Sequence, residues 1–149
     1  MSNSTLEQNE VLSKQLQSLF KSQNTRNELY QEFDIAFKDY LSGNCPAEQY
    51  HSICRIVTEG FQEVSVEIQT MEKNMTNALL ARTVRDLQEA ERKKLQEIQI
   101  LTVQSKESDK DYDETIREHQ ERLKEVLETI QDIMDELREE MAGLASLVC

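Results

Sequence analysis

The 149 residues carry a net charge of −12, with 38% hydrophobic and 31% charged residues. This length suits one domain with a core of its own. The acidic balance argues against non-specific binding of the chain to DNA or to anionic lipid headgroups, so a charged partner is expected to be basic.

The composition predicts an all-α protein. Three glycines, one proline and no tryptophan are typical of long helices joined by short loops. We expect an elongated antiparallel helical bundle or coiled coil of about four helices, forming a single domain over residues 1–149.

The first expected helix runs from about residue 6 to residue 41, with apolar residues three and four apart. Gln23 and Arg26 lie on the same face as these apolar residues, between the first and second halves of the helix. Thr25 and Glu28 resemble a capping box, which allows a break near residue 24. The heptad phase continues across that point and favours one long or kinked helix.

A loop is predicted at SGNCP, residues 42–46, because Gly43 suits a helix C-terminus and Pro46 suits the first position of the next helix. The second helix then continues to about Met75. Within it, Gly60 costs about 1 kcal/mol relative to alanine but permits close approach of a neighbouring helix. Seven of the eight aromatic residues lie at or before Phe61, so bulky packing is expected between the first two helices.

The apolar pattern restarts around residues 74–77. We predict a tight turn there, although a kink in a continuous helix would give the same pattern. The third helix follows, and the polar segment SKESDKDYD, residues 105–113, is read as a loop. An acidic fourth helix is expected at about residues 110–142, ended by Gly143, with LASLVC as a short apolar tail. Residues 105–140 hold fourteen acidic and six basic residues, a net charge of −8.

Two charged residues, Glu91 and Lys94, occupy the apolar seam of the third helix near Leu87. They are three positions apart and can touch each other. We interpret them as a partly exposed ion pair that fixes helix register. The alternative is a contact with a partner that needs both groups in a groove.

Four basic residues lie on the side of the third helix away from Leu87: Arg82, Arg85, Arg92 and Lys93. They make a solvated outer face, partly neutralised by Glu89 and Glu97, or a docking site for an acidic partner. Direct nucleic-acid binding is the least favoured reading, because four basic groups without interleaved aromatics make few phosphate contacts.

No catalytic residues, cofactor or metal site are predicted, and we expect the protein not to be an enzyme. The sequence lacks a glycine-rich phosphate loop, a nucleophile elbow and an HExxH motif. The three cysteines and two histidines show no zinc-binding spacing. With no secretory signal and no apolar run of about 20 residues, the chain is expected to be intracellular, nuclear or cytoplasmic, with no membrane contact.

Three stretches carry a family resemblance: ELYQEFDIAFKDYL, QYHSICRIVTEGFQEVSVEI and LLARTVRDLQEAERKKL. The resembling positions are Phe37, Tyr40, Leu41, Tyr50, Val57, Thr58, Phe61, Ser65, Leu87, Gln88, Glu91, Lys94 and Leu95. Over about residues 26–104 the chain resembles the required-for-excision B domain family, which is linked to excision repair of DNA. The resemblance implies a repair role without supplying catalytic residues or a cofactor.

Together these features predict a non-catalytic helical adaptor in DNA excision repair, with repair proteins as its partners. The alternative is a coiled-coil subunit of a cytoskeletal, ciliary or trafficking assembly with no repair role. The same apolar stripes serve packing within and between chains, so the oligomeric state stays open.

Overall fold

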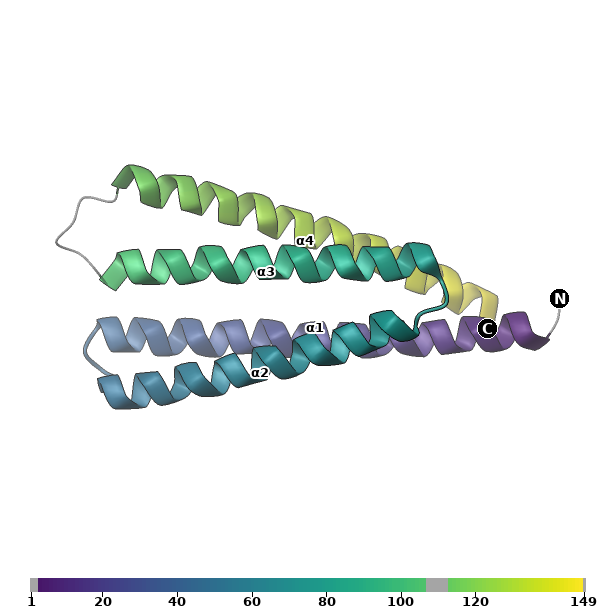
Figure 1. The fold of residues 1–149 in the computed structure, drawn as a ribbon, viewed down its shortest axis with the longest axis horizontal. Coiled ribbons are helices and arrows are strands. Elements are labelled where there is room, and N and C mark those ends of the chain that lie inside the picture. Colours follow the sequence, from purple (N-terminus) through teal and green to yellow (C-terminus); the bar gives the residue numbers. More distant parts are fainter. Residues whose placement is uncertain (1–2, 107–112, 149) are drawn as a thin grey trace. The chain divides into compact units, whose positions relative to one another are not determined.

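The computed structural model describes residues 3–106 and 113–148, which form four helices and, within these ranges, no strand. The helices are α1 (Asn3–Leu41), α2 (Ala47–Asn74), α3 (Ala78–Lys106) and α4 (Asp113–Val148) (Figure 1). The predicted all-α class and the number of helices are confirmed. Helices α1 and α2 form one compact unit, and α3 and α4 form a second. The single-domain expectation stays a prediction.

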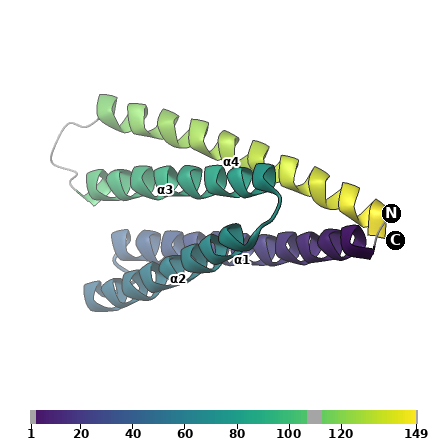
Figure 2. The ribbon, with the colours of Figure 1, turned by 45° about the vertical axis from the view of Figure 1, so that its right-hand side comes forward.

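Within each unit the chain folds back on itself, so that the two helices are antiparallel (Figures 1 and 2). In the first unit, Gln15 near the start of α1 donates a hydrogen bond to the Asn74 carbonyl at the end of α2. In the second unit, Glu97 of α3 contacts His119 of α4. The buried apolar residues of α2, Tyr50, Val57, Val64 and Ile68, follow helical spacing, as expected of a stripe packed against a neighbouring helix.

Helix α1 is continuous through the position where the capping box allowed a break. The Thr25 hydroxyl donates to the Lys21 carbonyl one turn earlier (3.1 Å), and Asn24 donates to Glu28 one turn later (3.2 Å). These bonds are made along the surface of an existing helix, so Thr25 does not begin a new one. The prediction of one long helix is confirmed.

The loop between α1 and α2 closes through a Schellman motif at Gly43. Gly43 has φ +82°, a conformation that few residues with a side chain adopt. Its N–H donates to the Tyr40 carbonyl (3.2 Å), while the Asn44 N–H donates to the Asp39 carbonyl (2.9 Å). Pro46 then lies one position before the first residue of α2, at its N-cap.

An aromatic cluster packs α1 against α2 beside this loop. Tyr50 is its centre, stacked on Tyr40 with ring centroids 4.5 Å apart and in edge contact with Phe37 at 6.1 Å. Further along the hairpin, Tyr30 packs on Phe61 at 4.6 Å. Burial raises the pKa of the Tyr50 phenol, so this ring stays neutral within the core. The predicted concentration of bulky packing between the first two helices is confirmed.

A tight turn separates α2 from α3, as predicted. Met75 is extended (φ −74°, ψ 127°), and its N–H donates to the Glu72 carbonyl. Asn77 caps α3, because its side-chain oxygen accepts the Leu80 N–H at 3.1 Å. An N-cap begins a new helix, which excludes a kink within a continuous one.

Helix α4 contradicts the predicted end at Gly143. It continues to Val148, so the segment read as a tail is helical for most of its length. The apolar stripe explains the difference: Leu137 and Met141 continue to Leu144, which is only 7% exposed. One glycine costs about 1 kcal/mol, and burial of a leucine contributes more than that. Of the loop predicted at residues 105–113, both ends are helical, since α3 runs to Lys106 and α4 begins at Asp113, and residues 107–112 lie outside the described residues.

Substitution of Asn77 by alanine should lower the free energy of unfolding by about 1 kcal/mol, because α3 loses its side-chain cap. Urea titration followed by circular dichroism checks this. Asn27→Ala, at an exposed interior position of α1, is the control and should be neutral or slightly stabilising. An equal loss in both variants would assign the effect to asparagine in general and not to the cap.

Substitution of Leu87 by aspartate should lower the free energy of unfolding by at least about 3 kcal/mol, because a charge replaces a fully buried side chain. Leu79→Asp is the matched control in the first turn of the same helix, where the leucine is 72% exposed. The control should shift stability by less than about 0.5 kcal/mol. A wild-type midpoint for Leu87→Asp would show that this stripe is not the packed seam.

Candidate partner-binding face

The four predicted basic residues all lie exposed on α3. We call them the basic face: Arg82, Arg85, Arg92 and Lys93. At about 100° per residue they share one side of the helix, opposite the buried Leu87. Glu89 lies within the same arc and Asp86 lies about 20° beyond its edge, so two nearby carboxylates offset half of the formal positive charge.

On this face Arg92 pairs with Glu89, one turn earlier on α3. The guanidinium donates two hydrogen bonds to the carboxylate, at 2.6 Å and 3.1 Å. The bonded Arg92 guanidinium holds the pKa of the Glu89 carboxyl below its usual value, and the charge of Lys93 adds to this effect. The predicted neutralisation by Glu89 is confirmed. A partner that uses Arg92 must compete with this carboxylate.

Glu97, the second residue expected to neutralise the basic face, has a different contact. Its carboxylate lies 2.5 Å from Nδ1 of His119 on α4. Both side chains are largely buried. This contact joins residues 22 positions apart on two different helices, so no spacing pattern within one helix predicts it.

The seam residues Glu91 and Lys94 lie on the buried side of α3, as predicted. Glu91 is only 4% exposed and Lys94 is half-buried. The Glu91 side chain is therefore more deeply buried than the predicted partly exposed pair requires. A buried carboxylate is tolerated only with compensating polar contacts. Their pairing with each other stays a prediction.

The first unit contains a buried polar cluster that sequence reasoning noted only as an interruption of the stripe. Arg26, 3% exposed, donates to Gln23 on the same helix (2.9 Å) and to Ser65 on α2 (3.4 Å). Ser65 is one of the positions that carried the family resemblance. The bond to Ser65 favours this register of α1 against α2, since a shift by one turn would move the guanidinium away from that hydroxyl.

Residues 3–106 and 113–148 contain no group of three or more histidine, cysteine, aspartate or glutamate side chains placed to hold a metal ion. Over the same ranges no helix is long and apolar enough to cross a membrane.

The family model of DNA repair REX1-B matches residues 14–105, which include most of α1, all of α2 and nearly all of α3. The chain belongs to this family, as the resemblance over residues 26–104 indicated. It is also 37% identical, over 78 residues, to the heterochromatin silencing protein rss1 of Schizosaccharomyces pombe. That alignment covers 52% of this chain and 59% of the relative, so the chain spans less than two thirds of that protein's length.

The Glu89 carboxyl should titrate below the ordinary glutamate value of about 4.3, and Arg92→Gln should move its midpoint upward. Its lowered pKa means that the stabilising contact is present above the ordinary value and is lost as the pH falls through the lowered one. Carboxyl chemical shifts followed by NMR give the midpoint. Arg138→Gln, which removes a cation bonded to Asp135, is the control and should leave Glu89 unchanged. An unmoved midpoint in Arg92→Gln would contradict the assigned cause.

Proposed function

We propose that this chain is a non-catalytic helical adaptor that acts in DNA excision repair in the nucleus. The observation that carries the proposal is the family match over residues 14–105, which contains the entire basic face. The similarity to a heterochromatin silencing protein supports a chromatin setting and hence the nuclear location. The partners are proteins, and the net charge of −12 opposes direct binding of the chain to DNA.

The basic face suits an acidic segment of a protein partner. Arg82 and Lys93 are eleven residues apart, which is about 16 Å along a helix. Arginine pairs with carboxylates through two parallel hydrogen bonds, so Arg82 and Arg85 offer geometric selectivity as well as charge. Exposed charges of this kind mainly raise the association rate and make it sensitive to salt.

The test is affinity purification of the tagged chain with mass spectrometry, before and after ultraviolet irradiation. Repair factors should be enriched, and their recovery should fall when the four basic residues are reversed together (Arg82→Glu, Arg85→Glu, Arg92→Glu, Lys93→Glu). The matched control reverses four exposed cations elsewhere: Lys14, Arg117, Arg122 and Lys124. Circular dichroism should show equal helicity in both variants.

Recovery that is equal in the two variants would remove the basic face from the mechanism. A partner list dominated by cytoskeletal, ciliary or trafficking subunits and unchanged by irradiation would contradict the repair role. Turnover of a nucleotide or nucleic-acid substrate by the pure chain would contradict the non-catalytic assignment.

A further inference from the structure

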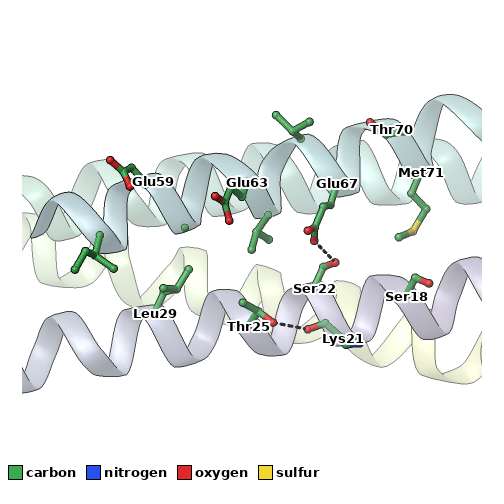
Figure 3. Close-up of a pocket in the computed structure, with 14 residues that line it drawn as sticks. Ser18, Lys21, Ser22, Thr25, Leu29, Glu59, Glu63, Glu67, Thr70 and Met71 are labelled. Carbon is green, nitrogen blue, oxygen red and sulfur yellow. Dashed lines mark hydrogen bonds between the residues drawn. The ribbon is translucent and has the colours of Figure 1, made fainter. Parts of the chain in front are cut away.

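A groove of about 880 Å³ lies between α1 and α2 in the first unit, and it shares no residue with the basic face on α3. Its α1 wall is mostly small and polar, with Ser18, Ser22 and Thr25 facing it (Figure 3). Its α2 wall combines apolar residues with glutamates. The carboxylates of the groove thus all come from α2.

The floor of the groove depends on Gly60. A Cβ atom at this position would lie 2.9 Å from both terminal methyl groups of Leu29 on α1. The absence of a side chain lets Leu29 pack directly over the α2 backbone, which confirms the predicted close approach of a neighbouring helix. Val64, which is buried, continues the floor. The groove therefore has an apolar base.

Two large apolar residues of α2, Ile56 and Val66, line the groove while largely exposed, at 62% and 60%. Exposed apolar residues are ordinary when scattered. These two lie along one groove, and β-branched residues are weaker helix formers than alanine. A partner that covered both side chains would remove their apolar surface from water, which would favour binding.

Three glutamates of α2, Glu59, Glu63 and Glu67, form a row with one residue per turn along the same wall (Figure 3). Like charges at this spacing destabilise an isolated helix by a few tenths of a kcal/mol per pair. Glu67 accepts a hydrogen bond from Ser22 at 3.1 Å, and Lys21 on α1 is the cation of the lining. The groove keeps a net negative charge.

We propose that this groove binds an amphipathic helix of a partner protein, with lysine or arginine at four-residue intervals beside an apolar row. The basic residues would lie against Glu59 and Glu63, and the apolar row would cover Ile56 and Val66. The wall from residue 56 to residue 71 is about 22 Å long, which matches a helix of about fifteen residues. A second copy of this chain is a poorer occupant, because two copies of net charge −12 repel each other. The inference goes beyond the proposed function, since it concerns another surface and holds with or without a repair role.

The experiment uses the full chain and a fluorescein-labelled sixteen-residue helical peptide, with lysine at every fourth position, leucine on the adjacent row and alanine elsewhere. Fluorescence anisotropy should show saturable binding. Glu59→Lys with Glu63→Lys should weaken it at least tenfold, and so should Ile56→Ser with Val66→Ser. The matched control, Glu139→Lys with Glu140→Lys on α4, makes the same change in charge and should alter the affinity less than twofold. All substituted positions are exposed, so helicity should be retained.

Four results would overturn the proposal. The first is absence of saturable binding. The second is an equal loss of affinity in the control pair, which would mean attraction by overall charge alone. The third is equal binding of a peptide with the same composition in scrambled order. The fourth is a dimer in analytical ultracentrifugation that Ile56→Ser with Val66→Ser abolishes, which would assign the groove to a second copy.

Discussion

The pairing of α1 with α2 is the contact on which the first unit depends. At one end Tyr50 stacks on Tyr40, and in the middle Arg26 reaches Ser65 across the helices. Apolar packing alone tolerates slippage by a turn, whereas a buried guanidinium has few places where its hydrogen bonds are met. The hydrogen bond from Arg26 to Ser65 therefore favours one register of α1 against α2, and the groove walled by Glu59 and Glu63 is found in that register.

The charged surfaces of the chain differ in sign, and this difference bears on an adaptor role. The basic face on α3 suits carboxylates, while the groove between α1 and α2 suits a basic amphipathic helix. Both surfaces fall within the region matched by the family model, residues 14–105. Two surfaces of opposite charge select partners of different chemistry.

The sequence predicts which residues of the candidate site are exposed, but it does not predict the contacts that these helices make with other helices. The exposure of Arg82 and the pairing of Arg92 with Glu89 follow from positions within one helix, where spacing of three or four residues determines which side chains meet. The contact of Glu97 with His119 joins two helices, so its residues share no spacing rule. The end predicted at Gly143 was wrong because a glycine is a weak stop when a buried leucine follows it.

The sequence by itself determined the four helices, the Gly43 loop and the buried stripe that includes Leu87, because helix periodicity and capping are local properties of the chain. It also placed Glu91 in the seam. Only the tertiary structure decided that Arg26 lies buried against Ser65 and that Leu29 packs over Gly60 beneath a groove. These features depend on the distance and register between helices, which are set by side-chain packing over the whole contact and not by any single segment.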